Sequence, residues 1–116
     1  MRIGVPAVAA AMLLAAAAQG GAQELPVLGQ GNVSCSAWLE RRVGDTAQAD
    51  TMIAWVLGYI TAYNEYAADP QADVSAGEET EALTGRIDDY CRENTTANLY
   101  QAAASLVAQL RQTTPQ

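Results

Sequence analysis

The chain has 116 residues, and its 6 basic residues, all of them Arg, are outnumbered by 13 acidic residues, so its formal net charge is −7 at pH 7. This length allows one small domain, and the negative charge argues against nucleic acids and anionic membrane surfaces as partners, because both require a basic patch. The chain has no His, the commonest metal ligand and neutral-pH acid–base group, and its 2 Cys are too few for a structural zinc site, so we expect no enzyme, metal ion or cofactor.

Residues 1–22 are typical of a secretory signal peptide. Met1-Arg2 form a short basic start, an apolar run covers residues 3–18, and Gly20-Gly21-Ala22 offer the small residues that a signal peptidase reads. The run is shorter than the roughly 20 apolar residues of a membrane-spanning helix, which argues against the alternative of an uncleaved anchor. The small residues predict cleavage after Ala22. Because the apolar run is rich in Ala, as in bacterial exported proteins, we expect a periplasmic location.

Export to an oxidising compartment determines how the two cysteines are interpreted. Small exported domains are commonly cross-linked, so a disulfide between Cys35 and Cys91 is the default interpretation. Closing the intervening loop stabilises a fold by about 4 kcal/mol in the chain-entropy model. A reactive thiol or a redox pair is the alternative, and the absence of a Cys-x-x-Cys motif argues against it.

The first segment of the exported chain has few features of regular structure. Residues 23–33 contain Pro and Gly and predict an extended, flexible leader. Ser34 predicts the N-cap of a first helix that runs to about Val43, because its hydroxyl can accept a hydrogen bond from the first turn. Gly44-Asp45 then ends this helix.

A second and longest helix is predicted to begin at Asp50 or Thr51 and to end at about Ala68, before Asp69-Pro70. Its apolar residues cover more than half of its circumference, which exceeds what one core face requires. We expect the surplus to form a homodimer seam or a client-binding surface, and core packing is the alternative. The apolar positions are Met52, Ile53, Trp55, Val56, Leu57, Tyr59, Ile60 and Tyr63.

Two more helices complete the prediction. Ser75 and Glu78 have the spacing of a capping box before a third helix that ends at Asn94, and Thr95 or Thr96 caps a fourth. Apolar residues recur at helical spacing in both, namely Leu83, Ile87, Tyr90 and Cys91 in the third and Leu99, Ala103, Leu106 and Leu110 in the fourth. The sequence therefore predicts an all-α, small four-helix domain over residues 34–112, cross-linked by one disulfide, with a disordered tail at residues 113–116.

Acid acts on this chain through its carboxylates. Without His or Lys, nearly all of the charge change on acidification occurs at about pH 4. A carboxylate that caps a helix has a lowered pKa, so its stabilising effect exists near neutral pH and is lost in acid. Asp50 at the start of the second helix and Glu78 at the start of the third are therefore candidate pH-responsive groups.

Three segments together resemble a known family. Residues 89–100 carry the pattern Tyr-Cys-basic-x-Asn-x-x-x-Asn-Leu-Tyr around the second cysteine, and residues 34–39 place an aromatic and then an aliphatic residue after the first cysteine. Residues 54–59 supply an apolar helical segment that contains Trp. Over about residues 34–110 the chain resembles the HdeA/HdeB periplasmic acid-stress chaperones, and the second-cysteine segment is the specific part.

The resemblance implies a small helical homodimer at neutral pH, with a disulfide between Cys35 and Cys91. In this family, acid loosens or dissociates the dimer and exposes apolar surface, which binds unfolding periplasmic proteins until the pH recovers. The implied client or dimer surface consists of Met52, Ile53, Trp55, Val56, Tyr59 and Ile60. The Trp-x-x-Gly-Tyr helix and the late cysteine also resemble the Tai/Rap immunity proteins, which implies the alternative of one specific effector bound at neutral pH.

Overall fold

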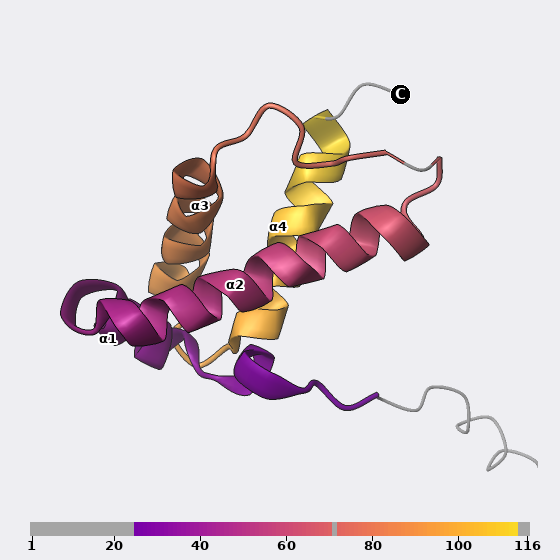
Figure 1. The fold of residues 1–116 in the computed structure, drawn as a ribbon. Coiled ribbons are helices and arrows are strands. Elements are labelled where there is room, and N and C mark those ends of the chain that lie inside the picture. The colour runs from indigo at the N-terminus through magenta and orange to yellow at the C-terminus, as the bar shows by residue number, and fades with distance from the viewer. Residues whose placement is uncertain (1–24, 71, 114–116) are drawn as a thin grey trace, which may run out of the picture.

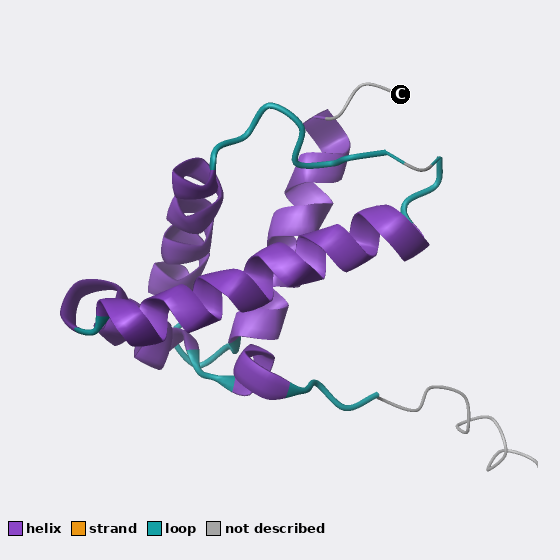
Figure 2. Ribbon diagram, in the orientation of Figure 1, coloured by secondary structure: helices purple, strands orange, loops and turns teal. Residues whose placement is uncertain are grey.

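The computed structural model describes residues 25–70 and 72–113. They form four α-helices and two short helical segments, and the described residues contain no strand, only one isolated bridge between Ser34 and Asn98 (Figure 2). The predicted all-α, four-helix fold is therefore confirmed. The predicted signal peptide lies outside the described residues, as do residues 114–116 of the predicted disordered tail. For Thr113 that prediction is wrong, because it is the last residue of the fourth helix.

The first two helices share one residue as their boundary. Helix α1, Cys35–Gly44, begins as predicted at Ser34, whose hydroxyl oxygen accepts a 3.1 Å hydrogen bond from the Ala37 N–H. Asp45 ends α1 and also caps α2, because its carboxylate accepts a hydrogen bond from the Gln48 N–H at 3.1 Å. Helix α2 therefore begins at Thr46, and the predicted start at Asp50 or Thr51 is wrong.

Helix α2, Thr46–Ala62, continues directly into a π-helical turn, η3, over Tyr63–Ala67. The backbone becomes extended at Ala68, immediately before Asp69-Pro70, as the sequence predicts. The following loop runs across the ends of α3 and α4 (Figure 1). One of its side chains, Val74, is buried in the core, so the loop is part of the packed structure.

The caps of the last two helices differ from the prediction. Helix α3, Thr80–Glu93, begins after Glu79, and Ser75 does not form a capping box, because its hydroxyl donates to Asp73 instead. Helix α4, Leu99–Thr113, is capped by Asn98 rather than by a Thr. The Asn98 and Gln101 side chains each accept a 2.9 Å hydrogen bond from the other residue's backbone N–H.

Helices α3 and α4 lie side by side, α2 crosses them, and α1 packs against α2 and α3 (Figure 1). The core fills the space where the four helices meet, and α4 contributes apolar side chains at successive turns. Its largest fully buried side chains are Trp38, Met52, Val56, Ile87, Leu99, Leu106 and Leu110. No helix among the described residues has the length and apolar character needed to cross a membrane.

Residues 25–33 form a segment that we call the strap. The prediction of an extended, flexible leader here is wrong for Gly29–Asn32, which form a short 3-10 helix, η2, that contacts α2 and α4. Gly29 adopts a φ of 69°, in the left-handed region where glycine is favoured. The turn directs Gly31 toward α2, where it is buried.

Candidate functional site

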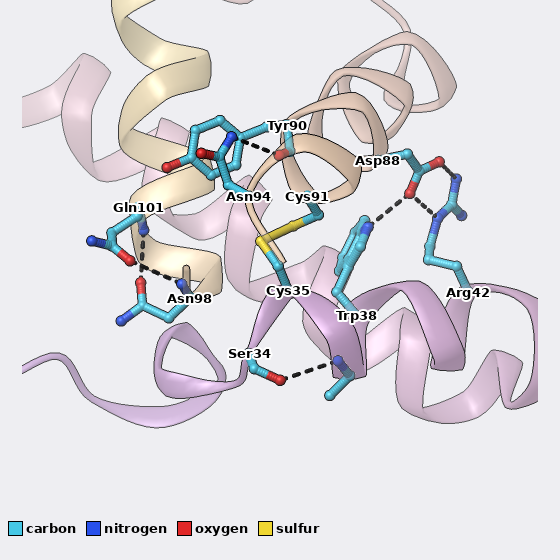
Figure 3. The surroundings of a disulfide bond; sticks show 11 residues. Ser34, Cys35, Trp38, Arg42, Asp88, Tyr90, Cys91, Asn94, Asn98 and Gln101 are labelled. Carbon is cyan, nitrogen blue, oxygen red and sulfur yellow. Dashed lines mark hydrogen bonds and ion pairs between the residues drawn. A yellow bond between two sulfur atoms is a disulfide. The ribbon is translucent and has the colours of Figure 1, made fainter. Parts of the chain in front are cut away.

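The Cys35–Cys91 disulfide is present as predicted (Figure 3). It joins the first residue of α1 to the last turn of α3, with a Cα–Cα distance of 4.9 Å, and both cysteines are fully buried. The described residues contain no free cysteine. The bond is therefore a structural cross-link within the core.

Beside the disulfide, Asp88 joins α3 to α1 (Figure 3). Its Oδ1 accepts hydrogen bonds from Trp38 Nε1 at 2.7 Å and from Arg42 Nε at 3.0 Å, and its Oδ2 accepts from Arg42 Nη2 at 2.9 Å. The guanidinium also lies over the Trp38 ring, 5.5 Å from its centroid. The Asp88 carboxylate accepts these bonds and thereby raises the pKa of Arg42, so the guanidinium stays protonated.

The six residues predicted as a client or dimer surface divide into two groups. Met52, Val56 and Ile60 are buried in the core, so they are not surface residues in the folded chain. Ile53, Trp55 and Tyr59 are half-buried and pack against the edge of that core. The apolar stripe of α2 is therefore wider than the core beneath it, and its flanks form the only part of the predicted surface that is accessible.

The strap covers one of these flanks. Trp55 Nε1 donates a 2.9 Å hydrogen bond to the Leu28 carbonyl oxygen, and Gly31 packs on the six-membered ring of the same indole. A Cβ at Gly31 would lie 2.6 Å from Trp55 Cη2 and 2.7 Å from Val27 Cγ1, so a larger residue cannot fit without movement. Glycine is thus required here by the close approach of the backbone to the indole.

Between the strap and the helices lies an open groove of about 730 Å³. Three rings form a row along it, with Trp55 stacked on Tyr59 at 5.7 Å between centroids and Tyr59 meeting the edge of Tyr100 at 5.8 Å. Burial raises the pKa of the Tyr59 hydroxyl, so this ring stays neutral well into the alkaline range. Among the described residues, no charged side chain lines the groove, although acidic residues are abundant in this chain.

The two carboxylates predicted to respond to pH do not occupy helix caps. Asp50 is exposed within α2, one turn beyond the real cap at Asp45. Glu78 precedes α3 and accepts a 2.7 Å ion-pair hydrogen bond from Arg86 Nη2. The sequence pattern predicts both as caps because it places the starts of their helices incorrectly.

A different carboxylate, Asp73, organises the loop before α3. Its Oδ1 accepts hydrogen bonds from the Ser75 hydroxyl at 2.6 Å, the Ser75 N–H at 2.9 Å and the Asn64 side-chain amide at 3.0 Å. The Asn64 side-chain oxygen Oδ1 accepts from the Val74 N–H at 3.0 Å, which fixes the residue that enters the core. The bonds from Ser75, followed by that from Asn64, lower the pKa of Asp73 below its ordinary value of 3.8.

The site therefore consists of a groove lined by three aromatic rings, an ordered strap and a loop organised by Asp73. Within the part of the chain that the structure describes, no three His, Cys, Asp or Glu side chains lie close enough together to hold a metal ion. In comparisons with known proteins, the chain matches no family model, no curated protein and no solved structure. The chemistry of these residues must therefore carry any functional assignment.

Proposed function

We propose that this chain is a periplasmic acid-stress holdase, which exposes apolar surface in acid and binds unfolding proteins before they aggregate. The resemblance of its cysteine segments to the HdeA/HdeB chaperones supports this function. The partners are unfolded periplasmic proteins, and the neutral-pH form is a homodimer that covers part of the same apolar surface. No catalytic residue or cofactor enters this proposal.

The width of the apolar stripe on α2 carries the proposal. Met52, Val56 and Ile60 follow one another at helical spacing and fill the core. Trp55 and Tyr59 lie beside this stripe, covered on one side only by the strap. A helix that needed only to fold would place polar residues at these flanking positions, because exposed apolar area favours association. Loosening of the domain would add the core stripe to the flank and produce one broad apolar surface.

The loop held by Asp73 supports the acid dependence. Because the folded-state pKa of Asp73 is lowered, its stabilising contribution is present above the ordinary value of 3.8 and is lost as the pH falls through the lowered value. Protonation removes the charge that organises Ser75 and Asn64, and Val74 is then held less firmly in the core. Loosening by this route is confined to strong acid, the condition under which periplasmic proteins unfold.

The experiment is an aggregation assay at neutral pH and at about pH 2–3, where most carboxylates are protonated. An acid-labile periplasmic protein is incubated with and without the oxidised chain, light scattering is recorded, and the same samples are run on a sizing column. The proposal expects suppression only in acid, together with loss of the neutral-pH dimer. A Trp55→Ala, Tyr59→Ala double variant should suppress less aggregation at equal concentration.

The contrary result also has a defined meaning. If the chain suppresses aggregation at neither pH, the holdase proposal is wrong. The fold would stand, and the alternative of a Tai/Rap-like binding protein would be tested by a search for a single partner captured at neutral pH.

A further inference from the structure

The contacts between the strap and α2 are mostly contacts that an unrelated extended peptide could make. The hydrogen bond to Trp55 Nε1 comes from a backbone carbonyl, and the closest packing on the indole comes from Gly31, which has no side chain. The leucines of the strap are not packed tightly, since Leu25 is 83% exposed and Leu28 is 74% exposed at the border of the groove. The surface thus recognises an extended apolar backbone more than it recognises this particular sequence.

One buried polar atom of the strap lacks a hydrogen-bond partner when the strap lies on α2. The Gln30 side-chain oxygen Oε1 is buried without a hydrogen-bond partner, and such an acceptor favours release to water. One side-chain bond holds the strap to itself, from the Asn32 amide Nδ2 to the Val27 carbonyl. The strap is thus ordered but replaceable.

We propose that the strap occupies part of the binding site for an extended apolar segment of another protein, and that such a segment replaces it on Trp55 and continues along Tyr59 and Tyr100 in the open groove. The inference rests on the proposed function for the nature of the partner, an unfolded protein. A backbone carbonyl of the incoming segment accepts the hydrogen bond from Trp55 Nε1, as the Leu28 carbonyl does in the structure.

Charge and spacing define the segment that fits. No charged side chain among the described residues lines the groove, so a buried charge on the ligand would find no counter-ion among them and would be disfavoured. The ring spacings of 5.7 and 5.8 Å approach the roughly 6.6 Å between alternate side chains of an extended strand. Successive rings can therefore contact alternate side chains of an uncharged, apolar segment.

The test uses a fluorescein-labelled peptide with the sequence Leu-Pro-Val-Leu-Gly-Gln, which copies residues 25–30, and measures its anisotropy at pH 7 with the full exported chain. The wild-type strap competes with the peptide. Asn32→Ala removes the bond to the Val27 carbonyl, so this variant should bind about tenfold more tightly, as expected when a binding-competent state becomes dominant. Adding Gln30→Met, which removes the unpartnered oxygen, should restore weak binding.

Matched variants separate the groove from general loosening. Gly31→Ala should increase peptide binding, because its Cβ collides with Trp55. Gly58→Ala, on α2 like Trp55, should not increase it, because a Cβ at Gly58 meets nothing within 4 Å. In the Asn32→Ala chain, Tyr100→Ala should weaken binding severalfold, whereas Tyr66→Ala, at an exposed ring outside the groove, should leave it unchanged. A peptide with Asp in place of its Val should bind poorly to every variant.

Two results would overturn the inference. One is an Asn32→Ala chain that keeps the near-ultraviolet signal of buried Trp38 and its intact disulfide, yet binds the peptide no better than the wild type. The other is a dimer of that variant that excess peptide does not dissociate, because a second copy would then be the occupant. Since all of these measurements are made at pH 7, they stand apart from the aggregation assay, and either proposal can fail while the other holds.

Discussion

Trp38 and Asp88 lie 50 residues apart in sequence, yet the indole of Trp38 donates a 2.7 Å hydrogen bond to the Asp88 carboxylate. Arg42 donates two further hydrogen bonds to the same carboxylate. The side chain of Asp88 is only 15% exposed, and Trp38 is fully buried. These hydrogen bonds thus hold α1 against α3 next to the disulfide.

Replacing Asp88 by Asn should destabilise the fold by about 1–3 kcal/mol, because the charged bonds from Arg42 are lost in a partly buried site. The amide oxygen can still accept from Trp38, so the variant should fold. Urea unfolding followed by Trp fluorescence measures the effect. Asp89→Asn is the control, because the Asp89 side chain is 75% exposed and pairs with Arg92 on the surface. Equal losses in both variants would contradict the structural role of Asp88.

Removing the disulfide should lower the free energy of unfolding by about 4 kcal/mol, since the unfolded chain gains the entropy of an open loop. The double variant Cys35→Ala, Cys91→Ala tests this without leaving a free thiol. Denaturant unfolding of this variant is compared with that of the oxidised and reduced wild-type chain. A stability equal to that of the oxidised chain would mean that the cross-link adds nothing to the packing around it.

Asp73→Asn should change how stability depends on pH. At neutral pH the variant should be less stable than the wild type, because it lacks the charge that accepts three hydrogen bonds. The difference should shrink as the pH falls below the ordinary value of 3.8 and through the lowered pKa. Thermal unfolding at a series of pH values measures it. Ser75→Ala, which removes the first of these donors, should produce the same trend with smaller amplitude, and a constant gap across the series would refute the assignment.

Neighbouring residues on α2 should respond differently to truncation. Met52→Ala should cost about 2–5 kcal/mol, as expected for a large buried side chain, because it leaves a cavity in the core. Ile53→Ala should cost clearly less, because Ile53 is only half-buried. The comparison by urea unfolding separates the core stripe of α2 from its accessible flank, and a reversed order would mean that the helix is rotated in solution.

Local patterns were sufficient for the helices themselves. The recurring apolar residues of α3 and α4 and the cap at Ser34 depend on neighbours within one or two turns, which a sequence displays directly. The caps at Asp45 and Asn98 were missed because several residues near each helix start have suitable side chains, and only the folded chain determines which one is used. Asp45 follows a Gly and precedes Gln48 by three residues, a signal that Asp50 lacks, because Asp50 follows Ala49 and precedes Ile53.

Contacts between distant segments could not be predicted in this way. Nothing in the pattern around Gly31 indicates an indole 24 positions later, and the pairing of Trp55 with Leu28 exists only because α2 and the strap meet in space. Nothing in the sequence distinguishes Asp88 from the adjacent Asp89, yet Asp89 is exposed whereas Asp88 is largely buried beside Trp38. Half of the predicted surface, namely Met52, Val56 and Ile60, is core in the structure. The helical period of a sequence shows how wide an apolar stripe is, but not which part of the stripe other elements cover.

The position of the disulfide divides the described chain into a covalent ring and two free arms. The ring, residues 35–91, contains α1, α2 and most of α3, whereas the strap and α4 lie outside it. Helix α4 nevertheless supplies Leu99, Leu106 and Leu110 to the core through noncovalent packing alone. When that packing fails in an oxidised chain, α4 can swing away as an arm while the ring keeps α1 beside α3. Recovery then requires the arms to redock on a ring that is already closed, a shorter conformational search than folding from an open chain.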